Sequence, residues 1–482
     1  MSRWIVSLVL FSSGALAQSQ PPNDVTPFVS VSAPAFVLNH VRVIDGTGVA
    51  AKEDQTLVVS KGKIESLGPC GTVKFPDTYM QLDRTGYTVI PGLVGMHNHL
   101  YYTDSISVQR NTDGTLGEPG LFVMELPFTA PRLYLAAGVT TMRTTGSVEP
   151  YTDLKIQRRI EAHLMPGPKI DLSAPYLEGK PTVFAQMHEL TGPDDAKRLV
   201  DYWAEEGMTS YKAYMNITRD DLAAAIQQAH AHHAKLTGHL CSVTWHEAIA
   251  LGIDDLEHGP VFADTDFVAD KKPDVCPAGG SKSWAGLDIN GPQVQELIRD
   301  LVSHHVAVTS TLPVFEAFLP GRPKLDQRVL DAMSAESARS YLIARARIAL
   351  DSPITALYKK ELEFEFAFAE AGGLLLGGPD PTGNGGVLPG FGDQKEVELL
   401  VEAGFTPVEA IKIMTLNGAT YLGRQDSIGS IAAGKQADLV LIKGDPSKKV
   451  EDIENVETVF KDGVGYDSKK LIDSVRGQVG IR

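Results

Sequence analysis

The middle of the chain alternates short apolar runs with longer helical patterns, and this alternation constrains the fold more than any other feature. Alternation of this kind is typical of repeated βα units, in which parallel strands are joined by helices. The candidate strands are residues 88–90, 140–142, 170–172, 210–213, 235–237, 255–257, 306–309 and 374–376. Eight strands in this order predict an α/β fold of the closed (β/α)8 TIM-barrel type.

The helical patterns between these runs carry start signals. Residues 219–233 and 244–251 have the apolar spacing of helices. The second pattern begins at Thr244, with Glu247 three residues later. This is the arrangement of a capping box, in which each side chain accepts a hydrogen bond from a free backbone N–H at the helix start. We therefore expect helices over both ranges.

Both ends of the chain have a different pattern. Residues 36–68 contain short β-rich runs separated by glycine turns, and residues 437–460 repeat this pattern before the hairpin turn Asp462-Gly463. Such runs are typical of antiparallel strands. We expect both ends to form one small β-sandwich domain. The expected limits are residues 18–88 and 425–482 for the β domain and residues 89–424 for the barrel.

The first residues have the pattern of an export signal. Arg3 precedes an apolar run over residues 4–11, and Ala15-Leu16-Ala17 follows. This order is typical of a signal peptide cleaved after Ala17. The apolar run is too short to span a bilayer, so we expect no membrane span. The sequence thus predicts that residues 1–17 are removed and that the protein is exported, either to a periplasm or to the medium.

The charge balance narrows the range of partners. The 482 residues include 44 Lys and Arg against 60 Asp and Glu, which gives a net charge of −16. A chain this acidic repels nucleic-acid phosphates, so we expect a small-molecule substrate and no nucleic acid. The sequence leaves open whether the chain forms a homo-oligomer.

Three cysteines, Cys70, Cys241 and Cys276, allow one disulfide at most, and the sequence does not say which pair forms it.

Ionisable side chains follow several of the candidate strands. His97 and His99 alternate by two, so on an extended backbone both point the same way. Later strand ends supply four more such residues, namely Lys212, His239, His258 and Asp380. In a (β/α)8 barrel these strand ends meet at one mouth. Buried ionisable groups without partners are costly, whereas imidazole and carboxylate groups together are suitable ligands for divalent metal.

These motifs resemble the amidohydrolase superfamily, in particular the imidazolonepropionase-like branch that includes metal-dependent dipeptidases and prolidases. The resemblance covers nearly the whole chain after residue 17. Besides the six residues above, its carriers are the segments 89–93, 137–143, 257–259 and 429–439. One departure is Pro379, where many relatives have Thr or Ser before the aspartate.

The resemblance implies a binuclear metal site. By analogy, His97, His99 and Asp380 hold one ion, and His239 and His258 hold the second. Lys212, carboxylated on its amine nitrogen, would bridge the two divalent ions, for which zinc is the expected metal. A free Lys212 ammonium would oppose two cations, whereas a carbamate adds a negative oxygen ligand for each.

This ligand set predicts hydrolysis of an amide. Two divalent ions lower the pKa of a shared water and polarise the substrate carbonyl. Asp380 is then placed to carry a proton from the water to the leaving nitrogen. Tyr214 lies two positions after Lys212, so its hydroxyl is a candidate donor to the oxyanion, although a packing role is an equal alternative. For Arg143 we favour a bracing role over binding of a substrate carboxylate.

We therefore expect an amidohydrolase that cleaves an amide or peptide bond, in dipeptides or N-acyl amino acids. The alternative enzyme is a deaminase or cyclic-amide hydrolase with one metal, in which Lys212 is not a ligand. A catalytically silent binding protein is a third hypothesis, which the complete ligand set disfavours. The residues 103–128 and 264–290 lack periodicity, and we expect them to form the walls of the substrate pocket.

Overall fold

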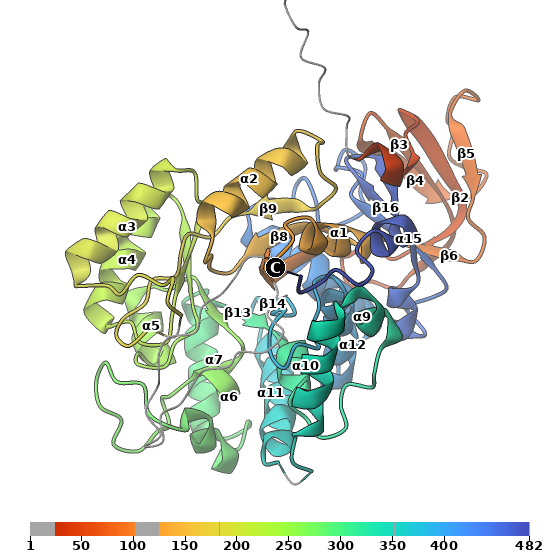
Figure 1. The fold of residues 1–482 in the computed structure, drawn as a ribbon. Helices are drawn as coiled ribbons and strands as arrows, with labels where there is room; N and C mark the ends of the chain where they lie inside the picture. Colours follow the sequence, from red (N-terminus) through yellow and green to blue (C-terminus); the bar gives the residue numbers. More distant parts are fainter. Residues whose placement is uncertain (1–24, 102–124, 183, 351, 482) are drawn as a thin grey trace, which may run out of the picture.

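The computed structural model describes residues 25–101, 125–182, 184–350 and 352–481 (Figure 1). The expected signal peptide, residues 1–17, and most of the expected pocket wall 103–128 lie outside the described residues. Within these ranges, none of the helices is both long and apolar enough to cross a membrane.

Strands from both ends of the chain form a single nine-stranded sheet, which lies at the upper right of Figure 1. Its order is β1-β17-β16-β15-β6-β2-β3-β4, with β5 paired to β2. The N-terminal and C-terminal halves meet where β6 pairs antiparallel with β15, with Ile90 opposite Val440. The strands are β1 Val29–Val31, β2 Ala35–Val43, β3 Lys52–Ser60, β4 Lys63–Pro69, β5 Met80–Asp83, β6 Tyr87–Pro91, β15 Leu439–Lys443, β16 Val456–Lys461 and β17 Val464–Asp467.

The strand predicted at residues 88–90 is present, but its assignment to the barrel is wrong. Residues 88–90 lie in β6 of the β domain, and the first strand of the α/β part is β7, Leu93–Asn98. The apolar run 88–94 contains Pro91 and Gly92, and the chain passes from one sheet to the other at this point. A proline followed by a glycine suits such a change of sheet, because proline cannot donate to a ladder.

The seven other predicted strands are present and are all parallel to their neighbours. They are β8 Val139–Thr144, β9 Lys169–Asp171, β10 Ser210–Ala213, β11 Lys235–Gly238, β12 Asp255–Glu257, β13 Ala307–Ser310 and β14 Leu375–Gly377. With β7 they form two sheets, one of three strands in the order β7-β8-β9 and one of five in the order β10-β11-β12-β13-β14.

The expected closed barrel is not seen as a continuous ladder over the described strands. Between β9 and β10 only isolated bridges occur, such as Ser173 opposite Ser210. The backbone N–H of Ser173 donates to the side chain of Thr144 at 2.8 Å, and Pro175 has no N–H to offer. The N–H groups of Ala174 and Leu177 donate to Ser210 O and Lys212 O, each at 2.9 Å, so single hydrogen bonds and not a continuous ladder join this segment to β10. The fold is therefore an α/β fold with a mixed sheet and two parallel sheets.

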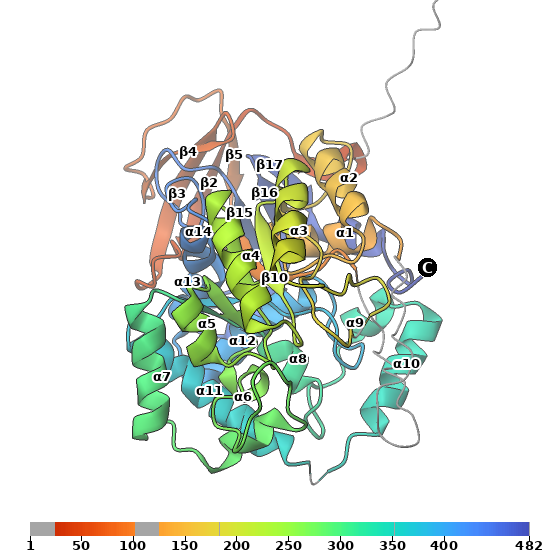
Figure 2. The same cartoon turned by 90° about the vertical axis from the view of Figure 1, so that its left-hand side faces the viewer.

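Helices cover the outside of the parallel strands, and α3, α4 and α5 lie in front of β10 in Figure 2. The predicted helix 219–233 is α4, and the predicted capping box of Thr244 and Glu247 is present at the start of α5. The helices are α1 Thr129–Ala136, α2 Pro150–Glu161, α3 Pro193–Glu205, α4 Arg219–Ala231, α5 Trp245–Leu251, α6 Pro260–Ala263, α7 Pro292–Ser303, α8 Leu312–Glu316, α9 Gln327–Ala332, α10 Ala335–Ala346, α11 Ile354–Glu370, α12 Phe391–Ala403, α13 Pro407–Lys412, α14 Gly418–Tyr421 and α15 Ser468–Asp473.

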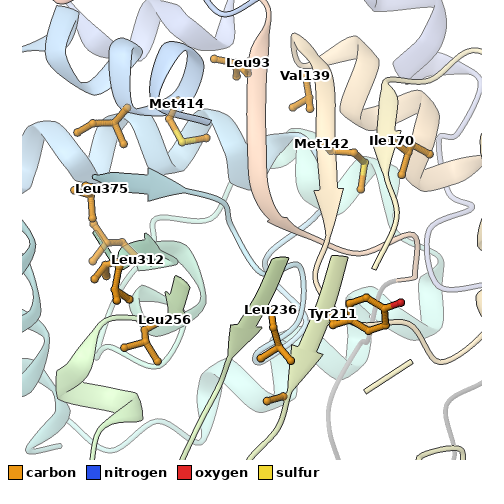
Figure 3. Packing of buried hydrophobic residues seen from close by; sticks show 14 of the residues in the cluster. Leu93, Val139, Met142, Ile170, Tyr211, Leu236, Leu256, Leu312, Leu375 and Met414 are labelled. Atoms are coloured by element: carbon orange, nitrogen blue, oxygen red, sulfur yellow. The ribbon is translucent and has the colours of Figure 1, made fainter. Parts of the chain in front are cut away.

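The strands of the parallel sheets place apolar and polar side chains on opposite faces. Apolar residues such as Met142, Tyr211, Leu236 and Leu256 are fully buried in the main hydrophobic cluster (Figure 3). Their neighbours along each strand point the other way, because side chains alternate in a strand. These neighbours are polar or charged, namely Arg143, Lys212, Thr237, Asp255 and Glu257, and all are buried. The inner face therefore presents the polar and charged residues, and the outer face packs in the hydrophobic core.

Candidate functional site

The six residues predicted as metal ligands lie on or just after five strands of the two parallel sheets. His97 is the last residue but one of β7, and His99 directly follows the end of that strand. Lys212 lies on β10, opposite Thr237 of β11. The remaining three residues follow the ends of β11, β12 and β14, and they are His239, His258 and Asp380.

His97, His99 and Asp380 form a compact group of ligand atoms. The Nε2 atom of His99 lies 3.3 Å from Oδ1 of Asp380, and Nε2 of His97 lies 3.8 Å from the same oxygen. One ligand atom from each of the three residues lies within 4.8 Å of the other two. All three side chains are largely buried. Two imidazoles and a carboxylate at this spacing are a donor set that divalent transition metals favour.

The structure brings the other two histidines beside this group. The ring centroids of His97 and His258 are 4.5 Å apart, and those of His258 and His239 are 4.2 Å apart. His258 Nδ1 lies 3.9 Å from Oδ2 of Asp380. The four imidazoles therefore form one continuous group, with Asp380 against three of them.

The backbone at Asp380 is shaped to hold its side chain in this position. Its φ is 48°, in the left-handed region, and its N–H donates to His97 O at 3.1 Å. Non-glycine residues in this region are uncommon and occur often at functional sites. Gly378 allows the close approach, because a Cβ there would lie 2.3 Å from the backbone N of His97. The chain after β14 is therefore packed directly on β7.

Burial keeps His97, His239 and His258 neutral. It lowers the pKa of His97 and His258 well below the usual value, and the charge of Lys212 lowers both further. Burial, with the same lysine, lowers the pKa of His239 to about 3. For Asp380, burial alone would raise the pKa, but the neighbouring His97, His99 and Lys212 outweigh it and hold the pKa below its usual range. Neutral imidazoles beside an ionised carboxylate are the forms that bind metal.

Two residues that orient the histidines were missed from the sequence. Glu257 Oε2 accepts a hydrogen bond from Nδ1 of His97 at 2.7 Å, and Thr311 Oγ1 lies 2.9 Å from Nδ1 of His258. The contact with Glu257 leaves Nε2 of His97 to face Asp380, at 3.8 Å from Oδ1. Carboxylate and hydroxyl partners of this kind fix the ring orientation of metal-binding histidines. Glu257 directly precedes His258 and lies two residues after Asp255. Side chains two residues apart in a strand point the same way, so this spacing is the signal in the sequence that Glu257 and Asp255 share the inner face.

Arg143 braces the inner face, in agreement with the favoured interpretation. Its guanidinium donates to Asp255 and Glu257, each at 2.8 Å, and its Nε donates to Met96 O at 2.8 Å. Arg143 is fully buried. The guanidinium thus fixes the carboxylate that orients His97, and it is not presented to a substrate.

Aromatic side chains line one side of the candidate site. The Tyr214 ring lies 5.1 Å from that of His239 and 5.0 Å from that of Tyr176. The Tyr101 ring stacks on His99 at 4.7 Å, and its hydroxyl lies 2.8 Å from the hydroxyl of Tyr176. Burial raises the pKa of Tyr214, so its hydroxyl keeps a proton to donate. Tyr176 also packs with Phe184 and Met187, which makes this side of the site apolar.

The disulfide that the sequence left open joins Cys241 and Cys276. It links the segment after β11 to the predicted wall 264–290, and Cys70 is the free cysteine. The expected maximum of one disulfide is confirmed.

The donor set passes a further test of fit to a metal. His99 Nδ1 is buried and has no hydrogen-bond partner among the described residues. The other ring nitrogen of His99, Nε2, lies 3.3 Å from Oδ1 of Asp380. An ion on that side would meet two imidazole nitrogens and one carboxylate oxygen, a donor set suited to divalent transition metals. The residues thus fit a divalent ion at His97, His99 and Asp380.

Sequence comparison matches two kinds of protein over short segments. Residues 388–465 match the model of the Amidohydrolase family. The imidazolonepropionase of Parabacteroides distasonis is 46% identical over 65 residues, which are 13% of this chain and 15% of that protein. Adenine deaminase 1 of Carboxydothermus hydrogenoformans is 42% identical over 57 residues, which are 12% of this chain and 9% of that protein. The matches thus span a small part of these curated relatives.

Structure comparison extends over most of the chain. A structure from Bifidobacterium longum, described as a prolidase, aligns with a TM-score of 0.64 and 23% identity over 92% of this chain and 99% of its own. A Xaa-Pro dipeptidase with methionine bound in its active site aligns with a TM-score of 0.65 and 19% identity over 90% and 100%. At these identities the likeness establishes the fold. The family match over residues 388–465, the imidazolonepropionase relatives and this shared fold together support an amidohydrolase superfamily member.

Proposed function

We propose that the protein hydrolyses a C–N amide bond in a small substrate, a dipeptide or an N-acyl amino acid. The observation that carries this proposal is the buried group of His97, His99 and Asp380, whose ligand atoms lie within 4.8 Å of one another. The proximity of His239 and His258 supports a second ion. In this proposal the strands β7 to β14 act as a (β/α)8 barrel that presents both ions at one mouth.

Lys212 is proposed as the bridging ligand in its carboxylated form. Its side chain is 1% exposed, and burial lowers its pKa to about 8 although Glu257 and Asp380 oppose the shift. Carboxylation by CO₂ requires the unprotonated amine, so a lowered pKa favours it. Besides burial, the charge of Lys212 lowers the pKa of both His97 and His239, so its side chain lies within electrostatic reach of both histidine pairs, which supports a bridge.

The residues of the site then have separate roles in amide hydrolysis. Bound divalent ions, with zinc as the proposed metal, supply an activated water and a Lewis acid for the substrate carbonyl. Asp380 accepts the proton of the attacking water on a carboxylate oxygen and delivers it to the leaving nitrogen. Tyr214 donates its hydroxyl proton in a hydrogen bond to the oxygen on which negative charge develops.

The aromatic side of the site supports an apolar substrate side chain. Tyr176, Phe184 and Met187 form an apolar cluster against which Tyr214 packs. A substrate held with its carbonyl at Asp380 and Tyr214 would place an adjoining side chain against this cluster. The dipeptidase of similar fold that holds methionine in its active site is consistent with such a substrate.

A second candidate function follows from the sequence relatives. An imidazolonepropionase and an adenine deaminase are among the curated matches, and they favour a deaminase or cyclic-amide hydrolase with one metal ion. In that case Lys212 stays unmodified. The number of bound ions and the state of Lys212 therefore distinguish the two proposals.

The test counts metal ions in purified protein by mass spectrometry. We expect about two divalent ions per chain, with Lys212→Ala lowering the count toward one. Lys235→Ala is the matched control, because Lys235 lies on the neighbouring strand and its ammonium bonds the backbone O of Tyr421 instead. A single ion, with an unmodified Lys212 by intact-mass analysis, would contradict the binuclear proposal and support the alternative.

The substrate is tested with a library of dipeptides and N-acyl amino acids on zinc-loaded protein. We expect turnover that favours apolar residues. Metal-free protein reconstituted in bicarbonate should recover more activity than protein reconstituted in CO₂-free buffer. Turnover of cyclic amides or aminopurines alone would contradict the proposed substrate class.

A further inference from the structure

Three potential ligand side chains meet at the surface of the β domain, on a sheet distant from the parallel strands (Figure 1). His40 lies on β2, Asp54 on β3, and Cys70 directly after β4. The Nε2 atom of His40 lies 3.7 Å from Sγ of Cys70, and its Nδ1 lies 2.8 Å from Oδ1 of Asp54. Ligand atoms from the three residues lie within 4.8 Å of one another.

The backbone turns these side chains toward one another at an irregular part of the sheet. The pairing of β2 with β3 shifts register on both sides of Val41. His40 has a φ of 58° and Asp54 a φ of 49°, both in the left-handed region. The N–H of Cys70 donates to Asp54 O at 2.9 Å, which fixes the cysteine beside this bulge. The three side chains are thus gathered by the sheet itself and do not depend on a long loop.

We propose that His40 and Cys70, with Asp54 orienting the imidazole, bind a divalent ion of the zinc class. A nitrogen and a sulfur that share one tetrahedral zinc, with bonds of about 2.0 and 2.3 Å, lie about 3.5 Å apart. The observed separation is 3.7 Å. Asp54 accepts from Nδ1 and so leaves Nε2 to face the sulfur, as carboxylates do for many zinc-binding histidines. Water fills the remaining positions, since His40 and Asp54 are exposed.

Charge also favours a cation at this place. Asp83, at the end of β5, lies close enough to His40 to interact with it electrostatically, and β5 pairs with β2 beside it. Asp54 adds a second carboxylate, and a bound Cys70 would be a thiolate. The nitrogen, oxygen and sulfur donors together suit zinc or cobalt better than magnesium or calcium, which prefer oxygen alone.

This site can be observed separately from the candidate site between the strand ends. The sequence has three cysteines, and Cys241 is bonded to Cys276, so Cys70 is the one thiol that can bind metal. The candidate catalytic ligands are imidazoles, a carboxylate and a lysine, and none contains sulfur. A spectroscopic signal of sulfur ligation therefore reports on Cys70 alone.

The experiment titrates the metal-free full chain with Co²⁺, without reductant, and records the near-ultraviolet absorption of a cobalt–thiolate bond. We expect the amplitude of the thiolate band to correspond to one bound Co²⁺ per chain, beyond the equivalents taken by the site between the strand ends, and Zn²⁺ to displace it. Cys70→Ser should abolish the band, and His40→Ala should weaken the Co²⁺ affinity about tenfold or more. His97→Ala, which affects the other site, should leave the band unchanged.

Two results would overturn the proposal. One is the absence of a thiolate band at saturating Co²⁺ in protein whose Cys70 reacts with a thiol reagent. The other is a band of unchanged affinity in His40→Ala, because cobalt would then bind a solitary thiol and not this constellation. Neither result depends on whether the protein hydrolyses amides.

Discussion

Glu257→Gln tests whether the buried network on the inner face controls metal binding. In the wild type the two oxygens of Glu257 accept from three donors: Nδ1 of His97, the guanidinium of Arg143, and the hydroxyl of Thr237. Glutamine has one oxygen and one NH₂ group in their place. If its oxygen stays with Arg143 and Thr237, its NH₂ faces Nδ1 of His97. The ring must then accept at Nδ1 and carry its proton on Nε2.

That tautomer cannot bind a metal through Nε2, so the size of the effect can be estimated. Loss of a carboxylate that orients a metal-binding histidine costs about 10- to 100-fold in metal affinity. If the amide instead turns the other way, its NH₂ faces two buried donors. Leaving a buried polar group unsatisfied costs about 1–3 kcal/mol of the free energy of unfolding. We expect the first effect to dominate at the metal site, with some loss of stability as well.

The assay measures zinc affinity by competition with a chromophoric chelator, and stability by urea unfolding of the metal-free protein. Asp255→Asn is the matched control, because Asp255 bonds the same guanidinium at 2.8 Å but does not contact His97. The control should lose stability and keep its zinc affinity within a few-fold of wild type. Wild-type zinc affinity in Glu257→Gln, or an equal loss in Asp255→Asn, would refute the role given to Glu257.

Four further predictions follow from individual side chains. Asp380→Asn should keep metal, since an amide oxygen can still bind, but lose about 100-fold or more in kcat because it carries no proton; near wild-type turnover would contradict this. Tyr214→Phe should lower kcat by about 100-fold with little change in KM if its hydroxyl stabilises the oxyanion, and leave kcat unchanged if the ring only packs. Burial raises the pKa of Asp153 to about 7, against about 3.9 in an unfolded chain, so the folded state holds its proton longer and loses stability as pH rises between these values. In urea unfolding at pH 5 and pH 8, Asp153→Asn should therefore show a smaller drop in stability than the wild type, and an equal drop would count against the shift. Under the export proposal, protein from its native host should begin near Gln18, and an intact first methionine on it would contradict export.

The sequence predicted the local elements well because each has a local cause. The apolar runs at 210–213 and 255–257 became strands at the same residues, and Thr244 and Glu247 formed their capping box. It misassigned 88–90, because an apolar run alone does not say which of two sheets will pair with it. The apolar runs also do not say whether neighbouring strands will form a continuous ladder, and between β9 and β10 the structure has isolated bridges only.

The site was predictable as far as it depends on residues at strand ends, and no further. Glu257 and His97 are 160 residues apart, and Thr311 and His258 are 53 apart, so each contact exists only after the strands have packed. The disulfide between Cys241 and Cys276 likewise joins residues that are 35 positions apart and that come together only when the chain has folded. The types of residue and their spacing along the chain indicate which side chains can bind metal. The orientation of each histidine ring depends on hydrogen-bond partners that come close only in the folded protein.

The alternation along the parallel strands separates stability from chemistry. Met142, Tyr211 and Leu256 point outward into the main core, and Arg143, Lys212 and Glu257 follow them on the inner face. The inner residues are polar or charged and buried, so the free-energy cost of their burial must be offset by the apolar outer layer and by their mutual hydrogen bonds. Changes to an inner-face residue that contacts a histidine should therefore alter metal binding, with a loss of about 1–3 kcal/mol in stability, whereas truncation of an outward residue creates a cavity costing about 2–5 kcal/mol. This division follows from the two-residue period of a strand, and it lets a buried site of many charges exist within a stable α/β fold.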